Sequence, residues 1–197
     1  MKLFKAAMAS LAMLVSGAAV TAPVAVAQGT NVIVIDQAKI MRDSAGGKDI
    51  ISKVNGIETT MQNELKPTAE SIAAEGQALE AKTANMTMEA ISADAALRAE
   101  VEAYARKAQD FNRKRQIAAA ELQATERKAW GDFFTAMQPV LQEVVTEKGA
   151  DVMLDRSDAV WAGASVDATD LVISKMNAKL PTVNVVRQKM PTQPQQQ

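Results

Sequence analysis

The sequence contains no cysteine and no histidine among its 197 residues. Without cysteine it can form neither a disulfide framework nor the lipid attachment site of a bacterial lipoprotein, so the fold must rest on packing or assembly. The absence of both residues excludes Ser-His-Asp and Cys-His nucleophilic systems and His- or Cys-ligated zinc. The phosphate-cradling motifs GxGxxG and GxxxxGK[ST] are also missing. We therefore predict a protein that is not an enzyme, with no catalytic, cofactor-binding or metal-binding residues.

An excess of charge of one sign is missing as well. The chain has 22 basic and 23 acidic residues, for a net charge of −1, which gives no global reason to expect nucleic acid or an anionic membrane as a partner. Asp151, Asp155 and Asp158 lie close together in sequence. We expect them to cap turns or face solvent, because acids at strand ends commonly do so.

Long apolar runs are confined to the N-terminus. Two lysines precede an uncharged run over residues 6–20, and the small residues Ala25 and Ala27 suit a signal peptidase. An N-terminal transmembrane anchor is the alternative, but it would need roughly 20 apolar residues, and Pro23 interrupts the segment. We predict cleavage between Ala27 and Gln28, export to the periplasm, and no stable membrane insertion.

The remaining chain is organised as strand, long helical stretch, strands, helix and tail. β-Branched runs predict strands at residues 31–35, 150–154 and 159–161. A final helix should end at Pro181, so we expect one domain over residues 28–180. The Pro- and Gln-rich residues 181–197 predict a disordered tail.

The helical stretch carries two heptad-like seams. The first consists of Ile50, Val54, Ile57, Met61, Leu65, Ala69, Ile72, Gly76, Leu79, Thr83 and Met86, and the second of Leu97, Val101, Tyr104, Ala108, Phe111, Ala118 and Leu122. Spacings of three and four residues predict a coiled coil, with a stutter near Pro67. Two such seams indicate an antiparallel hairpin arm over residues 41–145. Equal arms would place the tip within residues 85–94.

The small body, residues 28–40 and 146–180, cannot complete a core alone, because a few short strands leave open edges. The predicted fold class is therefore α+β, mainly α, with a helical hairpin arm on a β body completed by oligomerisation. We expect the strand residues to form the subunit interface: Val32, Ile33, Val34, Ile35, Val152, Leu154, Val160 and Trp161.

Two sets of arm residues are candidates for binding another molecule. Met86, Met88 and Ile91 near the tip could make flexible apolar contacts, or could simply fill the seam. Residues 106–115 hold five cations, Arg106, Lys107, Arg113, Lys114 and Arg115, against the single acid Asp110. They could attract acidic partners or lipid headgroups, or form a solvated face.

The order of elements, with NVIVIDQAKIM at residues 31–41 and KGADVMLDRSDAVWAGASVDATDLVISKMN at residues 148–177, resembles the OmpH/Skp family of periplasmic chaperones. The elements that carry the resemblance are Val32–Asp36, Asp151–Asp155, Ala159–Ala162 and Asp167–Ile173. It implies a homotrimer with a β-barrel body and three helical tentacles around a cavity.

The resemblance also implies an ATP-independent holdase that captures unfolded outer-membrane proteins and prevents their aggregation, with the two arm sets contacting the client. A structural coiled-coil spacer or adaptor of the cell envelope is the alternative. The best-known enterobacterial member is strongly basic, unlike this chain, so lipopolysaccharide binding does not follow. Nor does the tail belong to the family core.

Overall fold

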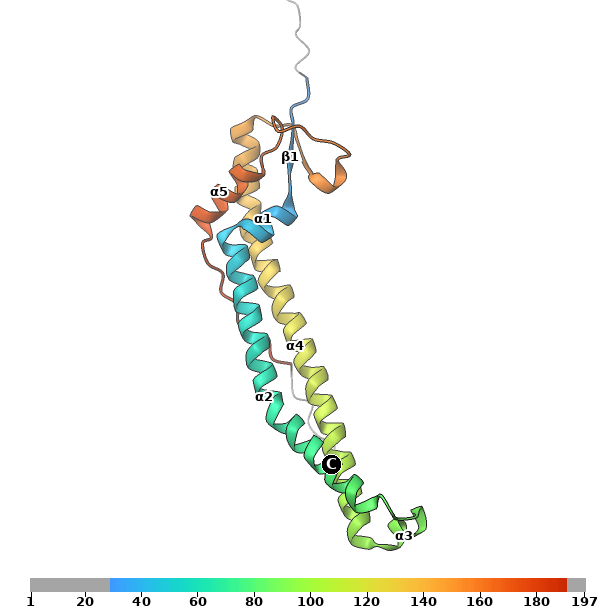
Figure 1. The fold of residues 1–197 in the computed structure, drawn as a ribbon. Coiled ribbons are helices and arrows are strands. Elements are labelled where there is room, and N and C mark those ends of the chain that lie inside the picture. The colour runs from blue at the N-terminus through green and yellow to red at the C-terminus, as the bar shows by residue number, and fades with distance from the viewer. Residues whose placement is uncertain (1–28, 191–197) are drawn as a thin grey trace, which may run out of the picture.

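The computed structural model describes residues 29–190, in which a long helical arm projects from a small body (Figure 1). The mainly helical fold with a small β body confirms the predicted fold class. In chain order the elements are β1 (Val32–Ile35), α1 (Gln37–Asp43), α2 (Ala45–Thr83), α3 (Met88–Ala93), α4 (Ala95–Lys148), β2 (Val152–Asp155), a 3₁₀ turn (Arg156–Asp158) and α5 (Thr169–Lys179).

The sheet of the body has two parallel strands, with Val32 of β1 opposite Val152 of β2. The prediction of a strand at residues 159–161 is wrong, because these residues form a loop. The other edge of β1 pairs instead with a later segment. The Val34 N–H donates to the Val166 carbonyl and the Val34 carbonyl accepts from the Ala168 N–H, both at 2.8 Å. These bonds occupy the edge of β1 that a third strand would need.

A sharp corner separates α1 from α2. Ser44 ends α1 and caps α2 by accepting from the Gly47 N–H at 3.2 Å. A Cβ at Gly47 would overlap the backbone carbonyl of Met41. Only glycine fits there, so the corner is fixed by the sequence at this point.

The hydrophobic core sits where the base of α4 meets β1, α1, α5 and the start of α2. Its largest fully buried side chains are Phe133, Ile35, Ile40, Ile50, Met137, Met176, Val140, Val144 and Val172. Trp130 and Phe134 pack edge-on against Phe133, with ring centroids 5.6 and 6.0 Å away. The body therefore buries a core within a single chain.

The arm consists of α2 and α4, which lie side by side and bow along their length (Figure 1). The 54 residues of α4 correspond to about 80 Å at 1.5 Å per residue. Val54, Met61, Leu97 and Ala118 of the predicted seams are buried, whereas most seam residues between Leu65 and Thr83 are only half-buried. Helix α2 continues unbroken through Pro67. The seam is thus well packed near the body and thin towards the tip.

Residues 181–190 leave α5 and run back along the arm in an extended conformation (Figure 1). We call this segment the strap. It makes hydrogen bonds to both α2 and α4, so the prediction of a disordered tail is wrong for these residues. Residues 191–197 lie outside the described part of the chain, as does the predicted cleavage site at Ala27 and Gln28.

Candidate functional site

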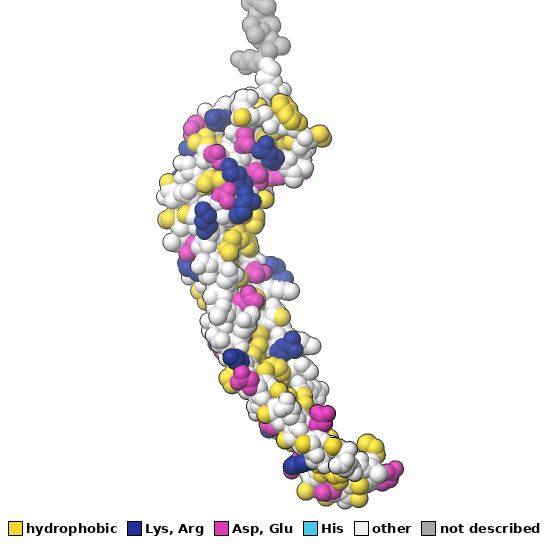
Figure 2. All heavy atoms as spheres, viewed as in Figure 1, with side chains coloured by type: hydrophobic (Ala, Val, Ile, Leu, Met, Phe, Trp, Pro, Cys, Tyr) yellow, Lys and Arg dark blue, Asp and Glu magenta, His cyan; other side chains and the backbone are white. Residues whose placement is uncertain are grey.

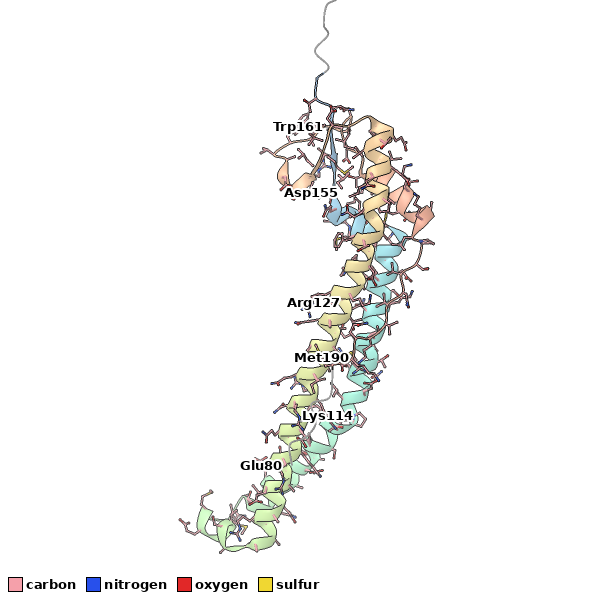
Figure 3. All side chains as sticks on the ribbon, turned by 180° about the vertical axis from the view of Figure 1, so that it is seen from behind. Glu80, Lys114, Arg127, Asp155, Trp161 and Met190 are labelled. Carbon is pink, nitrogen blue, oxygen red and sulfur yellow. The ribbon has the colours of Figure 1, made fainter. Side chains whose placement is uncertain are left out.

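An apolar patch is exposed on the body, and we call it the body patch: Val152, Leu154, Val160 and Trp161. Val152 and Leu154 share one face of β2, and both side chains are exposed. Val160 is fully exposed, and the Trp161 side chain is 84% exposed at the body end of the molecule (Figure 3). Hydrophobic atoms gather visibly there (Figure 2). An exposed indole next to an apolar strand is the kind of surface that a protein partner covers.

The other half of the predicted interface lies elsewhere. Ile33, Val34 and Ile35 are buried inside the chain's own core, and Val32 is half-buried. Ile33 and Ile35 pack within the core cluster, which includes residues of α1, α2, α4 and α5. Of the predicted interface residues, the exposed ones are those of β2 and of the loop that follows it.

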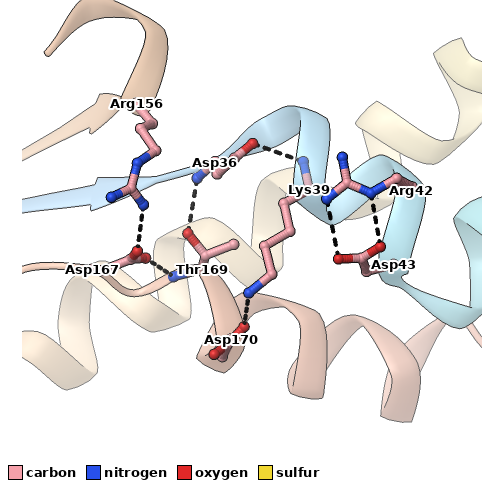
Figure 4. A network of polar contacts seen from close by, with 8 residues as sticks. All are labelled: Asp36, Lys39, Arg42, Asp43, Arg156, Asp167, Thr169 and Asp170. Carbon is pink, nitrogen blue, oxygen red and sulfur yellow. Dashed lines mark hydrogen bonds and ion pairs between the residues drawn. The ribbon is translucent and has the colours of Figure 1, made fainter. Parts of the chain in front are cut away.

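A polar network fixes that loop to the body (Figure 4). Arg156 pairs with Asp167 at 2.8 Å, and Asp167 also accepts from the Thr169 N–H at 2.9 Å. Thr169 in turn accepts from the Asp36 N–H at 2.9 Å. Burial opposes ionisation of Asp167, but bonds from Thr169 and Arg156 outweigh it and lower its pKa. The network holds both ends of the segment that carries Trp161.

The Asp residues near β2 have structural roles. Asp155 accepts from the Ser157 N–H at 2.8 Å and from the Gln37 N–H at 3.1 Å, and Asp151 accepts from the Asn31 N–H at 2.8 Å. Hydrogen bonds from Ser157 lower the pKa of Asp155. Across residues 29–190 the structure shows no cluster of acids that could hold a metal ion.

The far end of the arm exposes two methionines. The chain reverses between Thr83 and Ala95 through α3, whose first turn is capped by Thr87. Met88 is 73% exposed and Met86 is also exposed, whereas Ile91 is half-buried. The tip therefore offers flexible apolar side chains to solvent.

The five cations of residues 106–115 are exposed but differ in their neighbours. Lys107 bonds to both oxygens of Glu75 on α2, at 2.8 and 2.9 Å, and this bond lowers the pKa of Glu75. Arg113 pairs with Asp110 at 2.8 Å. Within the described chain no ion pair is recorded for Arg106, Lys114 (Figure 3) or Arg115. These three carry the available positive charge.

A family model for outer membrane protein (OmpH-like) matches residues 31–176. The chain belongs to the OmpH-like family. The crystal structure of a protein from Caulobacter crescentus CB15, provisionally described as an OmpH-like outer membrane chaperone, is similar to the structure of this chain, with a TM-score of 0.71. The two chains are 24% identical, and the match covers 83% of this chain and 94% of the other. No curated protein matches this chain.

The strap lies beyond the OmpH-like match, and two of its hydrogen bonds go to one buried acid. Glu121 of α4 is 5% exposed. It accepts from the Arg187 guanidinium at 2.7 Å and from the Met190 N–H at 3.0 Å. Burial opposes ionisation of Glu121, but these bonds and the charge of Arg187 outweigh it and lower the pKa of Glu121. Arg187 also bonds to Glu64 of α2 at 2.8 Å, so one side chain bridges the two arm helices.

Sequence reasoning missed this site, because Arg187 lies 66 residues from Glu121 and 123 from Glu64. A signal was present: Glu121 follows the seam residue Ala118 by three residues, a spacing that places it on the same face of the helix. A charge on a buried face requires a partner. In the described part of this OmpH-like chain, no helix is both long and apolar enough to cross a membrane.

Proposed function

We propose that this chain is an ATP-independent periplasmic holdase that binds unfolded outer-membrane proteins and prevents their aggregation. The observation that carries the proposal is the OmpH-like match over residues 31–176 on a chain whose two long helices project from a body with an exposed apolar patch. The C. crescentus protein of the same fold is described as an outer membrane chaperone, which supports the same role here.

The body patch supports assembly into a homo-oligomer, which we propose to be a trimer. Trp161 and Val160 are more exposed than side chains of this kind usually are in an isolated protein. Copies that join through their body patches would carry their arms together and enclose a space between them. A thin seam towards the tip lets the arms bend around clients of different size.

The proposal includes export. The residues on which it depends, the predicted cleavage pair Ala27 and Gln28, are assigned from the sequence alone. N-terminal sequencing of the protein recovered from the periplasmic fraction should begin at Gln28. A chain that keeps Met1 and stays with the cytoplasmic fraction would contradict this part of the proposal.

The direct test is an aggregation assay without nucleotide. An outer-membrane barrel unfolded in urea and diluted into buffer should stay soluble when the protein is present in stoichiometric amount. Light scattering follows the loss of the barrel from solution. An envelope spacer or adaptor would leave the barrel aggregating at the rate seen in buffer, and that result would remove the chaperone proposal.

A further inference from the structure

We propose that the groove between α2 and α4 near the body, now filled by the strap, is a binding site for extended client segments with alternating apolar residues. The strap is then an internal competitor that a client must displace. This inference rests on the proposed function for the identity of the client, but the groove itself is argued from the strap contacts.

Most hydrogen bonds between the groove and the strap involve backbone atoms of the strap. Asp49 accepts from the Val183 N–H at 2.8 Å, and Lys53 donates to the Val183 carbonyl at 2.7 Å. Thr125 accepts from the Gln188 N–H at 2.9 Å, and Glu121 accepts from Met190 as described. Every residue except proline carries the same N–H and C=O groups. A site built on such bonds accepts many sequences, as a chaperone for unfolded chains requires.

The strap side chains alternate as in a strand. Val183 is buried, Asn184 is exposed, Val185 is half-buried and Val186 is 58% exposed. Arg187 then turns inward to the acids of the groove. Alternating apolar and polar residues with a period of two are the sequence signature of transmembrane β-strands. An unfolded outer-membrane barrel therefore contains many segments that match this pattern.

The strap does not fill its groove completely. A cavity of about 90 Å³ remains between the strap and α4, lined in part by Thr125, Ala129 and Val185. A segment with larger apolar side chains could fill this space and gain contacts that the valines lack. The strap holds the groove through its covalent attachment, which raises its effective concentration, and through Arg187.

The first test uses a labelled peptide with the sequence of residues 181–190 and the full chain. Arg187→Gln in the protein should weaken the strap, so the peptide should bind about tenfold more tightly, the equivalent of one charge-assisted hydrogen bond. Lys189→Gln is the matched control, because it removes the same charge from an exposed strap residue that has no hydrogen bond recorded in residues 29–190 and acts on Glu121 only through its charge. This control should bind the peptide with an affinity much closer to that of the parent than to that of Arg187→Gln.

A second variant guards against misfolding, since Arg187→Gln leaves Glu121 without its cation. Gln188→Pro in the protein removes the strap N–H that donates to Thr125, keeps the buried Arg187–Glu121 pair, and leaves both the groove and the peptide unchanged. It should increase peptide binding by a smaller factor. Equal peptide affinity for the parent, Arg187→Gln and Gln188→Pro, with circular dichroism unchanged, would overturn the proposed competition.

The second test locates the client. A photo-crosslinker in place of Lys128, which lines the groove, should label an unfolded outer-membrane barrel, and more strongly with Arg187→Gln. The same group in place of Arg127, which projects away from α2 (Figure 3), should not. If the barrel stays soluble but is not labelled at position 128, the groove is not the client site, and the chaperone function is still supported. If the peptide binds but the barrel still aggregates, the chaperone function is contradicted, and the groove is still supported as a binding site.

Discussion

A Cβ placed on Gly76 of α2 would lie 2.8 Å from the hydroxyl oxygen of Tyr104 on α4. The two arm helices approach each other closely here because Gly76 has no side chain. Tyr104 lies across the resulting gap and is half-buried. This contact is the closest recorded approach of a glycine to the opposite helix of the arm, and it stands in the thin part of the seam.

Replacing glycine by alanine in α2 should change the stability of the protein differently at two positions. At Gly56 nothing lies within 4 Å of an added Cβ, so Gly56→Ala should stabilise the protein by about 0.5–1 kcal/mol through reduced backbone entropy. Gly76→Ala should stabilise it less, or destabilise it, because Tyr104 must move. Chemical denaturation followed by circular dichroism measures both. Adding Tyr104→Phe to the Gly76→Ala variant should restore most of the missing stabilisation, because it removes the hydroxyl that the new Cβ meets. If Gly76→Ala alone stabilises the protein as much as Gly56→Ala does, the contact is contradicted.

The body patch predicts which substitutions separate subunits. Trp161→Asp or Leu154→Asp should lower the mass in native mass spectrometry from about three subunits to one, while the helical signal stays. Both side chains are exposed in the single chain, so folding does not require them. Ile33→Asp is the contrasting variant, and it should unfold the body because Ile33 is buried in the core. A folded Trp161→Asp protein that keeps the parent mass would exclude the patch as the interface.

The unpaired cations predict an effect on the rate of client binding. Changing Arg106, Lys114 and Arg115 to Gln should slow association with an acidic client at low salt, because long-range attraction steers the encounter. Above roughly 0.15 M salt, where attraction is screened beyond about 8 Å, the variant and parent should converge. Stopped-flow fluorescence measures the rates.

A second triple variant is the matched control for net charge. In it, three exposed cations of the body and of its junction with the arm are changed to Gln: Arg42, Lys48 and Lys148. It alters net charge equally but should affect the rate less. If both triple variants slow association alike, net charge and not the segment 106–115 is responsible.

Acid should release the strap. The pKa of Asp49 is lowered by bonds from Lys53 and Val183, and the pKa of Glu121 is lowered by bonds from Met190 and Arg187 that outweigh its burial. A carboxyl whose pKa falls on folding stabilises the folded form above its ordinary pKa and loses that contribution as the pH drops through the lowered value. We expect strap release to begin below about pH 4.

Met190→Cys offers a clean reporter, because the chain has no cysteine. Met190 is 39% exposed, so a fluorophore at that position should report strap release as an increase in mobility, measured by fluorescence anisotropy on acidification. Glu121→Gln, which cannot ionise, should weaken the pH dependence. A signal that stays constant between pH 7 and 3 would show that the carboxylates do not hold the strap.

The local sequence was enough to determine the arm and its reversal. Ile50, Val54 and Met61 follow one another at helical spacing, and that spacing alone places them on one face of α2. The structure buries all three. The same holds for Leu97 and Ala118 on α4. Helices can be predicted in this way because each residue's face depends on its near neighbours in the chain.

Only the tertiary structure decided which segments flank β1 and where the chain ends up after α5. The β-branched pattern at residues 159–161 predicts a strand, but strand pairing depends on a distant partner, and Val166–Ala168 occupy that edge of β1. The alternation of Val183 and Val185 is likewise too short to predict from the sequence that this segment packs against the arm. Their position follows from bonds to Asp49, Thr125 and Glu121, which lie 134, 63 and 69 residues from their strap partners. Contacts over such separations are set by the folded arrangement of α2 and α4, because the sequence near the strap does not contain its partners.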